Sequence, residues 1–111
     1  MARFACYSDI HYSSMKVSLD DYVVDVLMRD LVAHDRSPAS FVVFVHLWRH
    51  TVGVNRGSIH QSHQQIADAT GLSKSAVQTA IRRLVRRRLV TAKRLRRTAR
   101  PEYVVHRPWG D

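Results

Sequence analysis

The chain has 111 residues, of which 45% are hydrophobic and 24% charged, and its 18 Lys and Arg against 9 Asp and Glu give a net charge of +9. A chain of this length forms one ordinary domain that buries about two-thirds of its unfolded surface, so its core needs no disulfide or structural metal. The single cysteine, Cys6, excludes an internal disulfide and a cysteine-rich zinc site and, with no signal-peptide pattern, indicates a reducing cytoplasm. The longest apolar run, residues 41–45, is too short to cross a bilayer.

The net charge is concentrated in the last third of the chain. Residues 1–73 carry six Lys and Arg against seven Asp, whereas residues 74–111 carry twelve against Glu102 and Asp111. Such asymmetry indicates a polyanionic partner, with nucleic acid first and an anionic membrane surface second. The alternative is a merely solvated surface, which is weaker because charges of one sign repel each other and destabilise the compact state.

The first third of the chain predicts an extended segment followed by a helix. Apolar and polar residues alternate over residues 1–15, as in a strand or an extended arm. Ser18 is a candidate cap for a helix over about residues 19–34, with Asp20 and Asp21 in its first turn. The apolar residues that recur at helical spacing along it are Tyr22, Val23, Val26, Leu27 and Leu31.

A second helix is predicted after a short polar connection. Ser37 is a candidate cap, and Pro38 suits the first helical position, where its missing N–H costs nothing. The helix is apolar nearly all round, so we expect it to be largely buried, to run through His50 and to end before Gly53. Residues 53–61 are predicted to be a loop with a short strand around Ile59.

Residues 62–85 have the pattern of two helices joined by a tight turn. Ser62 and Gln65 fit a capping box at the start of a short helix that Gly71 ends, since glycine can take a positive φ at the turn. Ser73 then caps a helix that runs through Val85. Two helices with such a turn form a helix-turn-helix. Its crossing angle would be set by small Ala67 and by the inward-facing residues Ile66, Leu72, Val77 and Ile81.

The face of the second helix opposite this apolar stripe carries only hydrogen-bonding or cationic side chains. Its residues are Ser75, Gln78, Thr79, Arg82 and Arg86. In the major groove, Gln pairs with adenine, Arg with guanine, and Ser or Thr with several base edges. Lys74 and Ser75, at the helix N-terminus, are placed to meet phosphate. We therefore expect this face to contact double-stranded DNA, against the alternative of an ordinary exposed polar face.

Two β-prone runs, residues 89–95 and 102–107, follow around a polar tip that contains Pro101, and they predict a hairpin. Over residues 65–77, 81–84 and 89–90 the sequence resembles the winged helix-turn-helix family of MarR-like and GntR-like bacterial regulators and of some phage and plasmid replication proteins. With the hairpin, the resemblance covers about residues 38–107.

The resemblance implies that a recognition helix, residues 73–88, enters the major groove while a wing, residues 89–107, lies along the backbone or minor groove. The recognition-helix contacts that it implies are Lys74, Ser75, Gln78, Thr79, Arg82 and Arg83. The wing contacts that it implies are Arg94, Arg96, Arg97 and Arg100. Between helix and wing these families often have glycine, and here Arg88 would have to take a left-handed conformation unless the helix ends differently.

Together these elements predict a mainly α fold with a small β-hairpin wing, namely a winged helix-turn-helix preceded by an extra N-terminal helix. We divide the chain into an N-terminal arm and helix, residues 1–36, and a DNA-binding domain, residues 37–111. The apolar face of the N-terminal helix packs either on its own domain or on a second subunit, so residues 1–36 are the expected contact of a homodimer. The predicted function is a transcriptional regulator in the cytoplasm, associated with the nucleoid. The alternative is a DNA-binding or protein-interaction module of a phage or plasmid replication complex.

No catalytic, cofactor or metal site is expected. His46 and His50, and likewise His60 and His63, have spacings that zinc can use, but the first pair lacks the glutamate of a metalloprotease and no cysteine lies nearby. His60 or His63 near a helix N-terminus is better explained as a cap or a phosphate neighbour. We expect Trp48, Tyr103 and Trp109 to pack in or beside the core. With no ligand-binding domain, neither a small-molecule effector nor a membrane partner is predicted.

Overall fold

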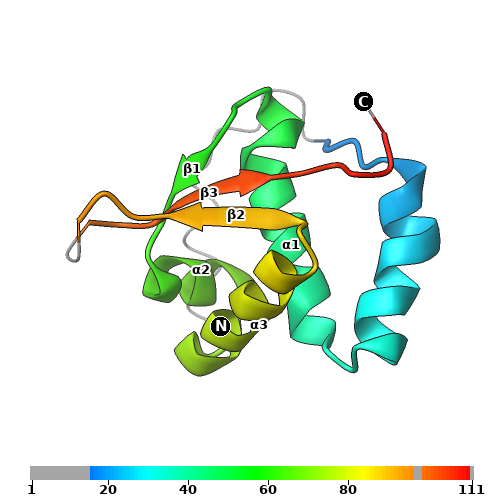
Figure 1. Ribbon diagram of the computed structural model, residues 1–111, viewed down its shortest axis with the longest axis horizontal. Coiled ribbons are helices and arrows are strands. Elements are labelled where there is room, and N and C mark those ends of the chain that lie inside the picture. The colour runs from blue at the N-terminus through cyan, green and yellow to red at the C-terminus, as the bar shows by residue number, and fades with distance from the viewer. Residues whose placement is uncertain (1–15, 97–98, 111) are drawn as a thin grey trace.

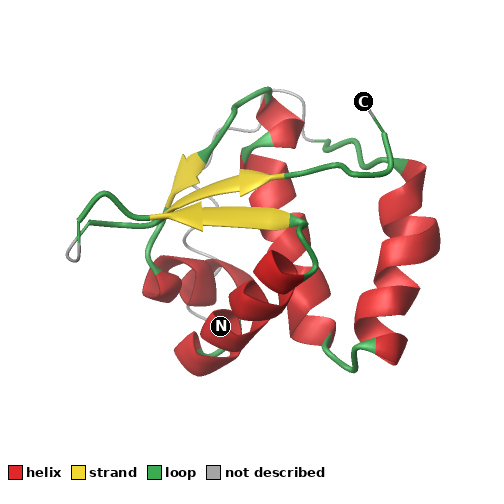
Figure 2. Ribbon diagram, viewed as in Figure 1, coloured by secondary structure: helices red, strands yellow, loops and turns green. Residues whose placement is uncertain are grey.

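The computed structural model describes residues 16–96 and 99–110, so the strand or arm expected over residues 1–15 lies outside the described residues. A long N-terminal helix is followed by α1 (Pro38–His50), the 3₁₀ turn η4 (Val52–Val54), the strand β1 (Ile59–His60), α2 (His63–Thr70), α3 (Lys74–Arg86) and the strands β2 (Val90–Lys93) and β3 (Glu102–Val105). Figure 1 shows α2 and α3 beneath the sheet and the N-terminal helix at the end opposite the projecting β2–β3 loop. The prediction of a mainly helical winged fold is confirmed (Figure 2).

The N-terminal helix spans residues 21–34, close to the predicted 19–34, but most of it is wider than an α-helix. Its π-helical segments are η2 (Val23–Leu27) and η3 (Asp30–His34). A turn of more than 3.6 residues places side chains four residues apart almost in line along the helix. Val23, Leu27 and Leu31 form such a line and are buried in the core. Ser18, the expected cap, lies before the start of the helix, and its carbonyl oxygen accepts a hydrogen bond from Trp48 Nε1 at 2.7 Å.

α1 begins at Pro38 as predicted, but the expected backbone cap by Ser37 is wrong. The Ser37 side chain makes no hydrogen bond to the backbone of the first turn; its Oγ lies 2.6 Å from Oγ of Ser40, and both residues are buried. Buried polar side chains are normally hydrogen-bonded, and here the Ser40 hydroxyl is the partner of the Ser37 hydroxyl. α1 itself packs against the N-terminal helix, α2 and α3, and its Phe44 and Trp48 are buried in the core.

The caps and the turn of the helix-turn-helix are confirmed. Ser62 Oγ accepts the N–H of Gln65 at 3.1 Å, and Gln65 Oε1 accepts the N–H of Ser62 at 2.9 Å. Gly71 ends α2 with φ of 82°, and Ser73 Oγ accepts the N–H of Ala76 at 3.1 Å to start α3. These local bonds satisfy N–H groups that a helix terminus would otherwise leave without a partner.

The strands form an antiparallel sheet in the order β1-β3-β2. Val90 pairs with Val105 and Lys93 with Glu102, which confirms the hairpin, and Ile59 pairs with Tyr103, which confirms the short strand around Ile59. Arg88, between α3 and β2, has φ of 61° and so adopts the left-handed conformation expected there.

After β3 the chain returns to the N-terminal helix. The Trp109 ring stacks on Tyr22 at a centroid distance of 4.8 Å, and its Nε1 donates to Oδ2 of Asp20 at 3.0 Å. Arg107 Nε reaches the same oxygen at 3.0 Å. Trp48 and Tyr103 are fully buried and Trp109 packs against the core, so the predicted packing role of the three aromatic residues is confirmed.

Candidate nucleic-acid interface

α3 has one apolar and one polar face. Val77, Ala80, Ile81 and Leu84 are buried, which fixes the rotation of the helix about its axis. Opposite them Ser75, Thr79, Arg82 and Arg86 are exposed, together with Lys74 at the helix start, while Gln78 is half-buried at the edge of this face. Arg82 Nη2 lies 3.3 Å from Oγ1 of Thr79, so the two side chains sit side by side.

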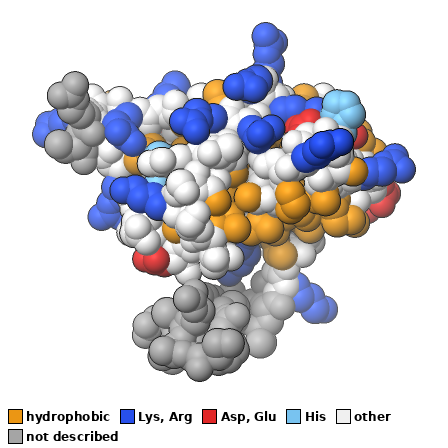
Figure 3. All heavy atoms as spheres, turned by 90° about the horizontal axis from the view of Figure 1, so that it is seen from below, with side chains coloured by type: hydrophobic (Ala, Val, Ile, Leu, Met, Phe, Trp, Pro, Cys, Tyr) orange, Lys and Arg blue, Asp and Glu red, His pale blue; other side chains and the backbone are white. Residues whose placement is uncertain are grey.

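The stretch of sequence from α3 through the β2–β3 loop carries charge of one sign. No Asp or Glu occurs between Asp68 and Glu102, a stretch that includes α3, β2 and the loop after it. Seen from below the view of Figure 1, Lys and Arg side chains gather over the upper half of the surface, and an apolar group lies beside them, toward the N-terminal helix (Figure 3). A surface of this kind attracts a polyanion over distances of about 10 Å at moderate salt.

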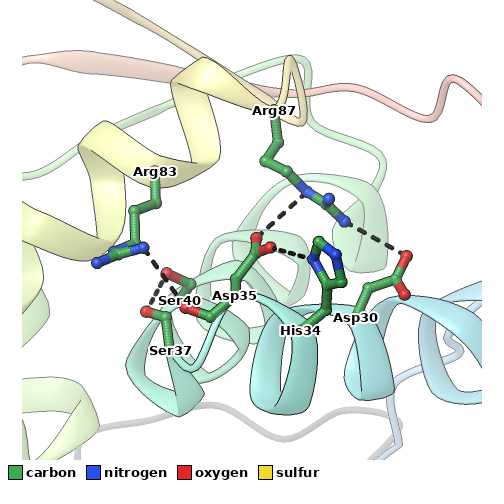
Figure 4. A network of polar contacts seen from close by, with 7 residues as sticks. All are labelled: Asp30, His34, Asp35, Ser37, Ser40, Arg83 and Arg87. Atoms are coloured by element: carbon green, nitrogen blue, oxygen red, sulfur yellow. Dashed lines mark hydrogen bonds and ion pairs between the residues drawn. The ribbon is translucent and has the colours of Figure 1, made fainter.

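Arg83 lies on the flank of α3 and turns away from the exposed face. Its Nη1 is 3.5 Å from the carbonyl oxygen of Asp35, at the end of the N-terminal helix. One turn later, Arg87 Nε is 3.5 Å from Oδ2 of Asp35, and Arg87 Nη2 is 3.4 Å from Oδ2 of Asp30 (Figure 4). Of these two arginines, the sequence analysis placed Arg83 among the DNA contacts and assigned Arg87 no role.

The contacts of Arg83 and Arg87 hold α3 in place. Asp35, also bound by His34 Nδ1 at 3.1 Å, is mostly buried, so its charge is only partly screened by water. The pairing ties the C-terminal end of α3 to the N-terminal helix and neutralises the Arg87 side of α3 (Figure 4). The sequence contains a signal for this pairing. Helix 21–34 and the residue after it are rich in aspartate, whereas the last third of the chain is strongly basic.

The loop between β2 and β3 carries the predicted wing contacts. Arg94, Arg96 and Arg100 are exposed there, and Arg97 lies outside the described residues. Leu95 at this tip is 96% exposed, so the loop stands clear of the domain (Figure 1). An exposed basic loop on a hairpin is free to follow the backbone of a nucleic acid beside α3.

A cavity of about 240 Å³ separates this loop from the two helices of the motif. Its basic walls are Lys74, the first residue of α3, and Arg94 and Arg100 from the β2–β3 loop. The opposite wall is the start of α2 with Ser62, His63 and Gln64, and Ala99 and Pro101 complete the lining. The pKa of His63 is lowered by burial and by the charges of Arg94 and Lys74. The sequence analysis placed Lys74, Arg94 and Arg100 separately, and the fold brings them together around His63.

Three other titratable groups, His46, His50 and Tyr103, are half-buried or buried. The His46 and His50 rings lie 4.7 Å apart, and His46 Nε2 hydrogen-bonds Oε1 of Gln61 at 2.8 Å. Burial and neighbouring positive charges lower the pKa of His50 to about 4, and burial raises the pKa of Tyr103 to about 12. Among the described residues, no three His, Cys, Asp or Glu side chains gather as metal ligands would. None of the described helices has the length and apolar character needed to cross a bilayer.

The chain matches a known family over part of its length. The family model described as the MarR family matches residues 51–101, which span β1, α2, α3, β2 and the loop of the hairpin. No curated protein and no solved structure matches the chain.

Proposed function

We propose that this chain, whose residues 51–101 match the MarR family model, is a transcriptional regulator that binds double-stranded DNA with a sequence preference. One observation carries the proposal. The exposed face of α3 opposite its apolar stripe is polar or cationic, the β2–β3 loop exposes Arg94, Arg96 and Arg100, and no carboxylate occurs between Asp68 and Glu102 to oppose a phosphate backbone. Affinity for DNA comes largely from such phosphate contacts.

In the proposed complex α3 lies in the major groove and its exposed face contacts base edges. Gln78 and Arg82 are four residues apart on this face and can each form a bidentate pair, with adenine and guanine respectively. Thr79 supports the Arg82 side chain from below, as their 3.3 Å contact indicates. Lys74, Ser75 and Arg86 contact the flanking backbone, and Arg83 contributes by holding α3 in place.

The wing lies on the neighbouring backbone or minor groove. Arg94, Arg96, Arg97 and Arg100 contact phosphate there and carry affinity more than sequence preference, since phosphate contacts hold no sequence information. The exposed position of Arg94, Arg96 and Arg100 supports this role.

A salt titration tests the proposal. Binding of a fluorescent duplex pool of random sequence is measured by anisotropy between about 50 and 200 mM salt. If about six phosphates are contacted, the logarithm of the association constant falls with the logarithm of salt at a slope near −5. Absence of DNA binding, or binding without salt dependence, contradicts the proposal. Absence of DNA binding, together with binding of an acidic protein partner, would favour the protein-interaction alternative.

The protein is proposed to act as a homodimer through an exposed apolar line on its N-terminal helix. Val24, Met28 and Val32 lie four residues apart there and are 43%, 40% and 38% exposed. They form a second line beside the buried one, and nothing in the described chain covers them. Contiguous exposed apolar side chains of this kind are typical of association sites.

Charge complementarity supports a second copy as the occupant. Beside the apolar line, the N-terminal half of the helix exposes Asp21 and Asp25, and Arg29 and Arg36 lie exposed toward and beyond its C-terminal end. When two such helices meet antiparallel about a two-fold axis near Met28, Asp21 of each lies near Arg36 of the other. A two-fold dimer would also present two recognition helices to a two-fold DNA site.

Sedimentation velocity tests the dimer. Met28→Glu places two carboxylates at the proposed axis and is expected to give monomers with unchanged circular dichroism. Val54→Glu is the matched control, because Val54 is similarly exposed, at 44%, but lies in η4 away from the helix. A wild-type chain that stays monomeric at high concentration, or a Met28→Glu variant that dimerises like the control, contradicts the proposal.

A further inference from the structure

The cavity between α2, α3 and the hairpin loop has the charge of an oxyanion site. Lys74, Arg94 and Arg100 reach it from three separate positions in the chain, and no carboxylate lines it. A volume of about 240 Å³ is several times the ~30 Å³ that a water molecule occupies in the liquid. All three side chains are cationic, and a bound anion would be attracted to them.

The wall of the cavity formed by the start of α2 adds hydrogen-bond donors and the titratable ring of His63. The capping box satisfies the N–H groups of Ser62 and Gln65. In helical geometry the first-turn N–H groups of His63 and Gln64 have no intrahelical acceptor, and both residues line the cavity. The His63 imidazole is there as well, half-buried between helix and hairpin.

We propose that this cavity binds one phosphate group of the DNA backbone and that His63 takes up a proton when the phosphate enters. The proposal rests on the DNA-binding function proposed above and extends it to α2, which the recognition helix and wing leave without a role. Lys74, Arg94 and Arg100 then bind the phosphate from the side of α3 and the wing, and His63 binds it from the side of α2. The protonated His63 ring donates an N–H to the phosphate oxygen.

The electrostatics give the proton uptake its direction. In the free protein the charged groups that face His63 are Lys74 from α3 and Arg94 and Arg100 from the hairpin, all positive. On its own helix, Asp68 is held by Nε2 of Gln64 at 2.9 Å. Burial and the positive neighbours lower the pKa of His63, which favours the neutral ring in the free protein. A phosphate brings negative charge into the cavity and raises the pKa again, because an opposite charge favours the protonated form.

The consequence is DNA binding that strengthens as the pH falls. A group that binds more protons in the complex than in the free protein makes the association constant rise toward acid pH, and each unit of pKa gained on binding contributes at most about tenfold. Between pH of about 8 and 6, where histidine titrates, wild-type affinity for a duplex is expected to rise several-fold.

The test compares two histidine variants at both pH values and constant ionic strength. His63→Gln is expected to abolish the rise in affinity at low pH. His34→Gln, which makes the same change at an exposed histidine of the N-terminal helix that does not line the cavity, is expected to keep it. DNA binding that is independent of pH in the wild type, or a full pH dependence in His63→Gln, overturns the proposal and leaves the DNA-binding function standing. Failure of any duplex to bind at either pH overturns the DNA-binding function itself.

Nuclear magnetic resonance of the imidazole ring distinguishes the source of the phosphate. The His63 ring signals are followed on addition of inorganic phosphate alone, and separately of duplex DNA. Movement of the signals with both ligands, or with DNA only, supports the site, and the first result shows in addition that it takes free phosphate. Unchanged His63 signals with saturating DNA overturn it.

Discussion

Trp109 joins the segment after β3 to the N-terminal helix, and Trp109→Ala is expected to lower the free energy of unfolding by about 3 kcal/mol. The ring stacks on Tyr22 at 4.8 Å and lies 6.4 Å from Trp48 and 6.5 Å from Phe44. Its Nε1 also donates to Asp20 at 3.0 Å. Full truncation of a core Trp costs about 3–5 kcal/mol, and Trp109 belongs at the low end because it is only partly buried. Urea unfolding followed by circular dichroism measures the loss, which at a slope of about 1–3 kcal/mol per molar lowers the midpoint by 1 M or more.

Two controls separate the ring from its hydrogen bond. Trp109→Phe keeps the aromatic stack and loses the bond to the carboxylate of Asp20, so about 1–2 kcal/mol is expected to be lost. Pro108→Ala changes an exposed neighbour and is expected to cost little. A Trp109→Ala loss below about 1 kcal/mol, or one equal to that of Pro108→Ala, would show that this residue does not fasten the N-terminal helix to the core.

Three further experiments test the turn geometry, the Arg87–Asp35 pair and the burial of His50. Gly71→Ala is expected to cost about 1–2 kcal/mol because φ is 82° there, whereas Arg88→Gly, at φ of 61°, should gain up to about 1 kcal/mol; equal effects in urea unfolding would refute the assigned turn geometry. A double-mutant cycle of Arg87→Met and Asp35→Asn should give a coupling of about 1 kcal/mol, and a value near zero would show that the pair does not hold α3. The lowered pKa of His50, about 4, means that stability present above pH of about 6.5 is lost as the pH falls toward 4; His50→Gln should flatten this part of the stability profile, and an unchanged profile would contradict the assignment.

The helix-turn-helix was predictable because its signals are local. Ser62 with Gln65, Gly71 and Ser73 each specify a cap or a turn within four residues, and the structure has all of them. Arg88 was the informative exception, since its left-handed conformation is imposed by the geometry that joins α3 to β2 and not by its own preference. The polar face of α3 followed in the same way from the spacing of its apolar residues.

The remaining features depend on residues distant in the sequence. Asp30 and Asp35 meet Arg87 across more than 50 positions, and Asp20 meets Trp109 across 89. No spacing rule specifies which of several acidic residues pairs with which arginine. The π-helical widening of the N-terminal helix was missed for a similar reason, since apolar residues at intervals of four suit both a surface α-helix and a wider one. The cavity beside His63 depends on where the hairpin loop folds relative to α2.

The central claim is that α3 contacts bases while the wing contacts backbone. Selection of binding sites from a random duplex pool, followed by measurement of Arg82→Ala and Arg96→Ala on the selected site and on an unrelated duplex, tests it most directly. Arg82→Ala is expected to weaken the selected site by about 1–3 kcal/mol and the unrelated duplex much less, whereas Arg96→Ala should weaken both alike. Equal losses on both duplexes for Arg82→Ala, or failure of the selection to enrich any sequence, would contradict the claim.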